Sequence, residues 1–293
     1  MAALALACLA APATSQVFYA PKGKPAQYTG PHRAHARLAD LKAKHKGKTS
    51  WRELLVDDVH LRSEYIWAPP GTRHPRALHP DTREWWVVME GEVRFEIETV
   101  EPVVARPGSI VQVPMQTLFS WQVAGDRPAL IFDTNIAGAR TLYTEQHQAP
   151  KLPGFDWLGV RFPNRRAGQW LHNNKVHVTF EEVARKLDGG ELKGTQKLVE
   201  DDRGAANGYE KQLPPLDPKA RGHYHPEGAE YWLIMAGEIR YPIEKVGVII
   251  AEVGDVVYVP AHTFHLPRWH GPGSSCRLAM NGFPYISHLF DPE

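Results

Sequence analysis

Short hydrophobic runs separated by turn-forming residues recur along almost the whole chain. The runs are rich in Val, Ile, Trp, Tyr and Phe, and Gly, Pro, Asp and Asn break them at regular intervals. The clearest lie at residues 85–89, 93–97, 110–113, 130–132, 231–235, 248–250 and 256–259. Runs of this length and spacing favour antiparallel strands in a sandwich or barrel. We therefore expect an all-β protein.

Helical patterns are few and short. Residues 34–46 combine good helix formers with lysines in the last turn and end at a glycine, which predicts a helix. The sequence Thr179-Phe-Glu-Glu182 is a capping box and predicts a second short helix that ends at residue 187, before two glycines. Residues 150–172 contain Pro-Gly and Asn-Arg-Arg steps, and we expect them to link the two halves.

The chain repeats itself with a constant offset of 146 residues. Residues 79–97 align with 225–243, and the same offset aligns Gly108 with Gly254. Because the offset does not change between these segments, the hairpins between them have equal lengths in the two halves. A repeat of this length indicates duplication of one β-domain.

The size and charge of the chain are consistent with two soluble domains. A chain of 293 residues is long enough for two domains, each with its own core. The repeat predicts an N-terminal domain with its entry arm at residues 17–149 and a C-terminal domain at residues 150–293. The net charge of +1 argues against nucleic acid or an anionic membrane as a partner. The 24 glycines and 25 prolines suit a turn-rich β-protein.

The first 16 residues predict a signal peptide that lacks its basic start. The stretch is apolar and contains an Ala-x-Ala pattern, and the first positive charge is Lys22. We therefore expect a periplasmic or secreted protein; a disordered apolar tail and a lipoprotein signal cleaved before Cys8 are the alternatives. After cleavage only Cys276 would remain, as a buried or half-buried thiol without a disulfide. No later stretch reaches about 20 apolar residues, so no membrane span is expected.

Three histidines and one glutamate in the second half have the spacing of a metal site. His223 and His225 are one residue apart, so on a strand their side chains share a face. Glu230 follows closely, and His265 comes about one hairpin later. Together these residues can form a cup of three nitrogens and one oxygen around a divalent ion, with open coordination positions.

These two segments resemble the paired motifs of the cupin superfamily. They read His-x-His-x4-Glu-x6-Gly and then Gly-x5-Pro-x4-His, and the first is similar in particular to germin-like cupins. The resemblance implies two tandem cupin jelly-roll barrels, a bicupin, with a metal held by the four residues just named. Two positions differ from the usual second motif, which often has glycine in place of His262 and asparagine in place of Trp269.

The first half keeps two of the four candidate ligands. His79 and Glu84 align with His225 and Glu230, but Ala77 and Phe119 stand in place of the other two histidines. Two ligands bind a metal weakly, and a phenyl ring fills the cup, so we expect this half to be structural. His74 could supplement the remaining ligands, or the emptied pocket could bind a small apolar or aromatic molecule.

Several residues near the second-half motifs are further candidates. Tyr224 lies between two inward-facing histidines, so strand alternation turns it away from the metal. His262 is a candidate base or substrate contact. Arg268 could hold a carboxylate substrate by a bidentate contact. We therefore predict catalytic roles for His262 and Arg268.

The predicted chemistry is that of one divalent transition metal, for which Cu, Mn, Fe, Ni and Zn all suit the ligands. The leading hypothesis is a metal-dependent oxidoreductase acting on a small organic acid or aromatic molecule, with dioxygen as a possible partner. The resemblance implies oxalate-type oxidases or ring-cleaving dioxygenases as models. The alternatives are a non-redox decarboxylase, lyase or isomerase of a small acid or sugar, and a non-catalytic binding or storage protein. Monomer and homodimer both remain open.

Overall fold

The computed structural model of the chain describes residues 17–171, 174–192, 195–200, 206–211, 219–273, 275–282 and 286–291. The expected signal segment, residues 1–16, lies outside the described residues, and so does the last residue of the expected linker, 172. In the described ranges, no helix combines the length and the apolar character that a membrane crossing requires.

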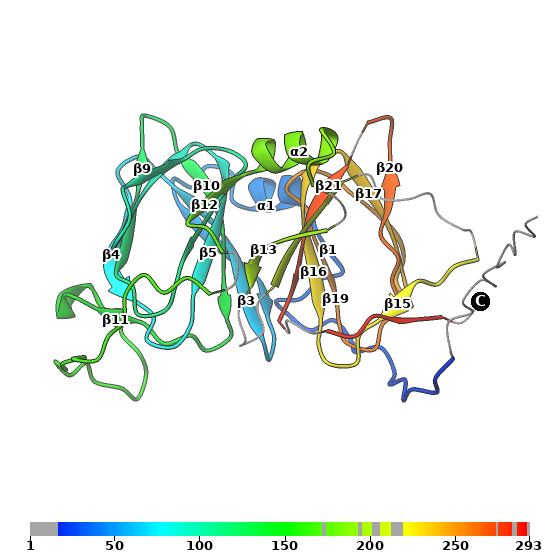
Figure 1. Cartoon of the computed structure of the whole chain (residues 1–293), viewed down its shortest axis with the longest axis horizontal. Helices are drawn as coiled ribbons and strands as arrows, with labels where there is room; N and C mark the ends of the chain where they lie inside the picture. Colours follow the sequence, from blue (N-terminus) through cyan, green and yellow to red (C-terminus); the bar gives the residue numbers. More distant parts are fainter. Residues whose placement is uncertain are drawn as a thin grey trace, which may run out of the picture.

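The first half of the chain forms a barrel of two antiparallel sheets (Figure 1). One sheet has the order β12-β8-β5-β10-β3-β2 and the other the order β11-β4-β9-β6-β7. These strands are β2 (Trp51–Asp57), β3 (Leu61–Ala68), β4 (Arg73–Leu78), β5 (Glu84–Glu90), β6 (Glu92–Ile97), β7 (Val103–Ala105), β8 (Ser109–Val113), β9 (Phe119–Ala124), β10 (Ala129–Ile136), β11 (Leu142–Tyr143) and β12 (His177–Thr179). A short 3₁₀ helix (Gln146–Gln148) follows β11.

The second half forms a barrel of the same kind beside the first (Figure 1). One sheet has the order β1-β19-β16-β21-β14-β13, and the opposite side consists of β18-β17-β20 and the pair β15-β22. These strands are β1 (His35–Ala36), β13 (Gln196–Glu200), β14 (Ala206–Lys211), β15 (His223–Tyr224), β16 (Glu230–Ala236), β17 (Glu238–Ile243), β18 (Gly247–Ala251), β19 (Val256–Val259), β20 (Arg268–His270), β21 (Cys276–Asn281) and β22 (Leu289–Phe290).

Each barrel receives one strand from the other part of the chain. Strand β1, from the N-terminal arm, pairs with β19 of the second barrel, and β12, from beyond the linker, pairs with β8 of the first. A helix follows each exchanged strand, α1 (Leu38–Lys44) after β1 and α2 (Phe180–Asp188) after β12. Both helices lie on the same side of the molecule, where the barrels meet (Figure 1). The domain boundary between residues 149 and 150 stays a prediction, and both exchanged strands reach across it.

Large aromatic side chains fill both barrel interiors. In the first barrel, Trp86, Phe95 and Phe119 are buried in one hydrophobic cluster. In the second barrel, Trp232 and Tyr241 take part in the corresponding cluster. Because side chains alternate along a strand, the inward positions of each barrel strand form one continuous core.

The outward face of one sheet from each barrel forms a third cluster, which joins the two barrels. Trp85 and Phe132 of the first barrel lie in the same buried cluster as Tyr231 and Met280 of the second. The hydroxyl groups of Ser63 and Tyr231 form a hydrogen bond of 2.5 Å across this interface. Burying a large apolar side chain contributes roughly 1.5–3 kcal/mol. We infer that the two barrels are stable as one unit.

The local predictions agree with the structure except at the start of the first helix. All the hydrophobic runs lie in strands. Thr179 caps α2, because its hydroxyl group accepts a hydrogen bond of 3.1 Å from the backbone N–H of Glu182. The helix predicted at residues 34–46 was wrong at its start, since α1 begins only at Leu38. The preceding residues instead pair with β19, and this tertiary pairing outweighs the local helix propensity. Residues 150–171 contain no helix or strand, as expected of a linker.

Candidate metal centre

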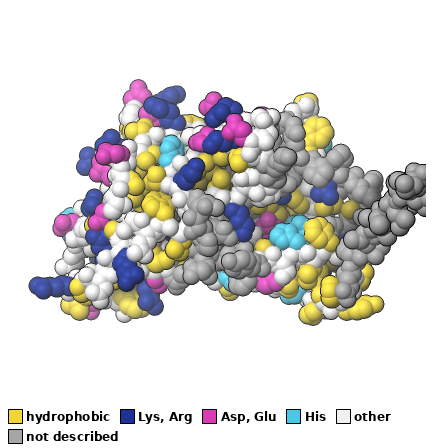
Figure 2. Space-filling view, viewed as in Figure 1, with side chains coloured by type: hydrophobic (Ala, Val, Ile, Leu, Met, Phe, Trp, Pro, Cys, Tyr) yellow, Lys and Arg dark blue, Asp and Glu magenta, His cyan; other side chains and the backbone are white. Residues whose placement is uncertain are grey.

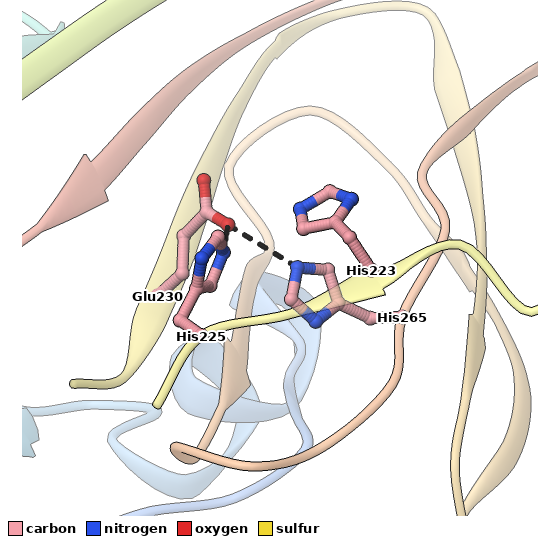
Figure 3. Close-up of side chains that lie close together, drawn as sticks. All are labelled: His223, His225, Glu230 and His265. Carbon is pink, nitrogen blue, oxygen red and sulfur yellow. Dashed lines mark hydrogen bonds and ion pairs between the residues drawn. The ribbon is translucent and has the colours of Figure 1, made fainter. Parts of the chain in front are cut away.

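The four predicted ligands meet at one end of the second barrel (Figure 3). They come from β15 and the residues after it, from the start of β16 and from the segment between β19 and β20: His223, His225, Glu230 and His265. One potential ligand atom from each side chain lies within 4.8 Å of the others. The sequence prediction that these side chains converge is therefore confirmed.

A direct backbone bridge holds the first and last histidines together. The N–H of His223 donates to the carbonyl oxygen of His265 (3.2 Å), and the N–H of His265 donates back to that of His223 (3.0 Å). Gly222, just before this bridge, has a φ of +83°. A Cβ atom at this position would overlap the carbonyl oxygen of His265, so glycine is required for the two segments to approach.

Hydrogen bonds orient two of the imidazole rings. Nε2 of His225 and Nε2 of His265 lie 2.8 Å and 3.2 Å from the same carboxylate oxygen of Glu230. Their Nδ1 atoms face the backbone carbonyl oxygens of Ser287 (2.7 Å) and Thr263 (2.9 Å). Because a carbonyl oxygen only accepts hydrogen bonds, each Nδ1 carries a proton, and Nε2 points to the centre of the site.

Without an ion, the carboxylate of Glu230 is paired with the imidazoles of His225 and His265. Burial raises the pKa of Glu230, but the hydrogen bonds and charges of His225 and His265 outweigh it and hold the pKa well below its usual value. Burial also lowers the pKa of His225, and its hydrogen bond with Glu230 more than reverses this effect. Burial, followed by the charge of His265, lowers the pKa of His223 to about 2. The site thus holds an anionic carboxylate and a neutral imidazole.

The residues present fit one divalent transition-metal ion. Nε2 of His223 is buried and has no hydrogen-bond partner among the described residues. A buried polar atom without a partner costs about 1–3 kcal/mol, and a bound ion would provide the partner. Three imidazole nitrogens and one carboxylate oxygen suit Mn, Fe, Ni, Cu and Zn.

The four side chains differ in their exposure to solvent. His225, Glu230 and His265 are buried, whereas His223 is half-buried. On the side of the barrel interior, the ring of Trp232 lies 5.2 Å from the ring of His265. His223 is therefore the most exposed of the four candidate ligands.

The structure does not bring the two predicted catalytic residues to the centre. Nδ1 of His262 accepts a hydrogen bond from the N–H of Gly23 (3.2 Å), and its ring lies 6.0 Å from that of Tyr224, a residue that strand alternation turns away from the ligands. Arg268 lies opposite Arg240 on the neighbouring strand. The residues directly before and after Arg240 point into the barrel interior. Because side chains alternate along a strand, Arg240 and its partner Arg268 point outward. The catalytic roles of His262 and Arg268 stay predictions. Tyr224 is buried, as its predicted packing role requires.

A further histidine lies beside the centre and was missed by the sequence motifs. The ring of His288 is 4.8 Å from that of His223 and 4.6 Å from that of His225. It lies just before β22, outside both cupin motifs. The internal repeat could have pointed to this position. With an offset of 147 residues, one more than in the motifs, residue 288 aligns with Thr141, so the two halves differ here.

The first barrel has the same framework but only two of the four ligands. Ala77 pairs with Phe119, just as His223 bridges to His265 in the second barrel. The ring of Phe119 lies 5.5 Å from that of His79. The candidate extra ligand, His74, instead stacks on Phe119 at 5.2 Å. Among the described residues, only the set in the second barrel meets the criterion for a metal site.

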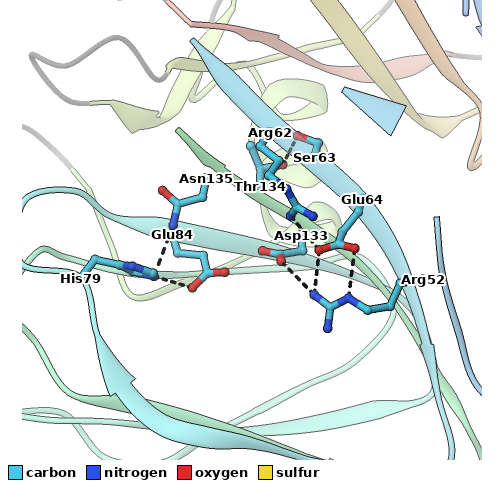
Figure 4. A network of polar contacts seen from close by, with 9 residues as sticks. All are labelled: Arg52, Arg62, Ser63, Glu64, His79, Glu84, Asp133, Thr134 and Asn135. Carbon is cyan, nitrogen blue, oxygen red and sulfur yellow. Dashed lines mark hydrogen bonds and ion pairs between the residues drawn. The ribbon is translucent and has the colours of Figure 1, made fainter. Parts of the chain in front are cut away.

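A network of protein hydrogen bonds takes the place of the ion in the first barrel (Figure 4). Nε2 of His79 lies 2.8 Å from the carboxylate of Glu84. Burial, followed by the charge of Glu84, raises the pKa of Asp133 well above its usual value, so Asp133 keeps a proton and donates it to Glu84. Ala279 occupies the corresponding position in the second barrel. The first barrel therefore satisfies its buried carboxylate without a cation.

The comparisons with known proteins agree with this architecture. The Cupin_2 family model, described as a cupin domain, matches residues 66–135 and residues 210–280, one segment in each half. No curated protein sequence matches the chain.

Solved structures with two such barrels are similar to this chain. A salicylate 1,2-dioxygenase from Pseudaminobacter salicylatoxidans has a TM-score of 0.65 and 13% identity, over 92% of this chain and 89% of that chain. A mutant of the same enzyme has a TM-score of 0.65 and 12% identity, over 93% and 90%. A mutant of oxalate decarboxylase from Bacillus subtilis has a TM-score of 0.49 and 15% identity, over 83% and 75%. At this low identity, the similarity to the two dioxygenase structures establishes the fold alone.

Proposed function

This chain belongs to the cupin superfamily as a bicupin, and on that premise we propose that it is a metal-dependent oxidoreductase of the oxidase or dioxygenase type. Its substrate would be a small organic acid or aromatic molecule, bound at the metal of the second barrel. The similarity to a salicylate 1,2-dioxygenase supports this choice, because a dioxygenase uses the same architecture.

The observation that carries the proposal is the convergence of His223, His225, Glu230 and His265. A set of four protein ligands leaves coordination positions open on an ion that accepts five or six. Nε2 of His223, buried and without a partner among the described residues, is the atom that most directly requires an ion. A redox-active ion bound there supplies the open positions and the electron transfer that oxidation of the guest by dioxygen needs.

The residues of the chain itself orient the guest and exclude water. The carbonyl oxygens of Ser287 and Thr263 fix the tautomers of two ligand histidines, so their Nε2 atoms stay directed at the centre. Glu230 stays anionic and balances part of the charge of the ion. The ring of Trp232 lies against that of His265 on the side of the barrel interior. Such a largely buried site limits the access of water to reactive species.

We also propose that the protein acts in the periplasm or outside the cell. The support is the apolar stretch at residues 1–16, with its Ala-x-Ala pattern. Expression of the full chain with a C-terminal tag, followed by fractionation and N-terminal sequencing, tests this. A tagged protein that stays uncleaved in the cytoplasm would contradict it.

Metal content and oxygen uptake test the enzymatic proposal. Purified protein should contain about one transition-metal ion per chain, as the donor set predicts. With a panel of small organic acids and phenols, at least one compound should cause oxygen uptake that stops when the metal is removed and returns when it is restored. Metal-dependent consumption of a compound without oxygen uptake would instead indicate a non-redox enzyme. Absence of bound metal after exposure to all five candidate ions would refute the proposal.

A further inference from the structure

The C-terminal segment of the described chain lies along the edge of the metal centre. Strand β22 pairs with β15, the strand that carries the first ligand histidine, and runs beside it in Figure 1. The N–H of Ser287 donates to the carboxylate of Glu227 (3.2 Å), and the N–H of Asp291 donates to the carbonyl oxygen of Gly222 (3.0 Å). The segment is thus fixed on both sides of residues 288–290.

This segment places two side chains beside His223, the most exposed of the four candidate ligands. The ring of His288 lies 4.8 Å from that of His223 and 4.6 Å from that of His225. The ring of Phe290 lies 5.0 Å from that of His223, and the side chain is 66% exposed. Figure 2 shows histidine side chains at the surface of the second half, next to hydrophobic ones. Both side chains therefore border the most exposed edge of the centre.

The first barrel provides a matched reference for this segment. Its strand β11 pairs with β4 in the same way, and the carbonyl oxygen of Arg140 accepts a hydrogen bond from Nδ1 of His79 (2.8 Å). The carbonyl oxygen of Ser287 does the same for His225 (2.7 Å). This correspondence, with an offset of 147 residues, aligns Thr141 with residue 288. The barrel that lost two of its ligands therefore has a threonine in place of His288.

We infer that His288 and Phe290 recognise the molecule that binds at the metal of the second barrel. His288 forms a hydrogen bond with an oxygen atom of the guest, and Phe290 contacts a flat apolar part of it. The guest class is then an aromatic or unsaturated carboxylic acid. This inference rests on the proposed function of the metal centre.

The geometry gives each side chain a role that differs from that of a ligand. His288 does not belong to the group of side chains whose ligand atoms converge. Its Nδ1 lies 3.3 Å from the carbonyl oxygen of Ile286, which leaves Nε2 directed away from its own backbone contact. An imidazole can donate or accept a hydrogen bond with an oxygen of the guest. An exposed phenyl ring favours contact with another flat apolar surface.

Binding of simple acids to the cobalt-loaded protein tests the inference without measuring activity. The metal-free protein is loaded with Co(II), and its visible spectrum is titrated with acetate and with benzoate. The variants are His288→Thr, which copies the first barrel, His288→Gln, which retains a hydrogen-bonding group, and Phe290→Ala. His270→Thr is the control, because it removes an exposed imidazole from β20 of the same barrel.

All variants should bind one Co(II) with the same spectrum before an acid is added. His288→Thr should weaken the binding of both acids by about tenfold, the factor that corresponds to one hydrogen bond, and His288→Gln should recover most of it. Phe290→Ala should weaken the binding of benzoate by about fivefold and leave the binding of acetate unchanged. The control should match the wild type.

The outcomes separate this inference from the function on which it rests. Unchanged acid binding in His288→Thr would overturn the inference while the metal site stands. Loss of Co(II) from His288→Thr and His288→Gln would also overturn it, because His288 would then be a ligand. If the wild type binds no Co(II), the proposed function fails and the inference fails with it.

Discussion

The two barrels share a framework, but only one has a site that needs an ion. In the second barrel, His223 and His265 form a backbone bridge, and their side chains face Glu230. In the first barrel, Ala77 and Phe119 form the same pair, and the glutamate is held by a histidine and a protonated aspartate. The comparison shows how a barrel without the full ligand set satisfies its interior: an apolar side chain occupies the space, and hydrogen bonds within the protein satisfy the remaining polar groups.

The strongest test of the comparison is to give the second barrel the residue that the first barrel has in place of a ligand. In His265→Phe, a direct ligand is lost and a phenyl ring enters the cup. We expect metal affinity to fall by more than about 100-fold, because even loss of an outer hydrogen bond costs up to that factor. The measurement is metal content after dialysis against a weak chelator. Phe119→Leu is the control and should keep one ion per chain; full metal content in His265→Phe would contradict the assignment of this ligand.

The reverse change should create a second site. The triple variant Ala77→His, Phe119→His and Asp133→Ala gives the first barrel the residues of the second at these three positions. We expect it to bind about two ions per chain instead of about one, since the ligand set is then the same in both barrels. Calorimetric titration of metal into the metal-free protein measures the number of sites. Adding Glu84→Gln should remove the second site, and a triple variant that folds but binds one ion would show that more of the barrel must change.

The exchanged strands are anchored differently in the two barrels. Asp255 accepts hydrogen bonds from His35 (2.7 Å) on β1 and from the N–H of Leu38 (2.9 Å) in α1. At the corresponding position, the hydroxyl group of Ser109 lies 3.0 Å from Nε2 of His177 on β12. Asp255→Ala should lower the free energy of unfolding by about 2–4 kcal/mol, because buried donors lose a charged partner. Ser109→Ala should lower it by about 1 kcal/mol. Urea unfolding at neutral pH measures both, and equal losses would contradict the comparison.

The pH dependence of the Asp255 contribution follows from its lowered pKa. Burial acts to raise this pKa, but the hydrogen bonds from His35 and two backbone N–H groups outweigh it. The stabilisation is therefore present above the unfolded pKa of about 3.9 and is lost as the pH falls through the lower folded value. The difference between wild type and Asp255→Ala should shrink in this acidic range.

Asp133 should show the opposite dependence. Its pKa is raised, so the folded protein keeps a proton that the unfolded chain releases above about pH 3.9. The contribution of Asp133 to the stability of the folded protein is therefore lost as the pH rises. Asp133→Asn can still donate to Glu84 and does not ionise, so it should be more stable than the wild type at pH 7, by about 1.4 kcal/mol for each unit of the raised pKa. Thermal unfolding from pH 4 to pH 8 should show a gain that vanishes at the acidic end; a constant difference would refute this account.

Local patterns in the sequence were sufficient to predict most strands and the four ligands. Hydrophobic runs and turn residues act over a few positions, so the strands could be located without tertiary information. The ligands could be found because His223 and His225 share one face of a strand by simple alternation. The first helix was placed too early because residues 35–36 join β19, more than 200 residues away in the sequence.

Other parts of the site depend on contacts that no local pattern encodes. His262 lies within the second motif, yet its ring accepts a hydrogen bond from the backbone N–H of Gly23 rather than facing the centre. His288 lies outside both motifs, and β22 brings it to the ligands through pairing with β15. In both cases the position of the side chain is set by a backbone segment that arrives from a distant part of the chain.

The amino-acid sequence alone determined the duplication, the all-β fold and the identity of the four ligands, because periodicity, turn chemistry and residue spacing are local properties. The tertiary structure decided which barrel each exchanged strand joins and which other side chains border the centre. These features arise from hydrogen bonds and packing between segments that lie far apart in the chain, and their geometry exists only once both barrels have closed.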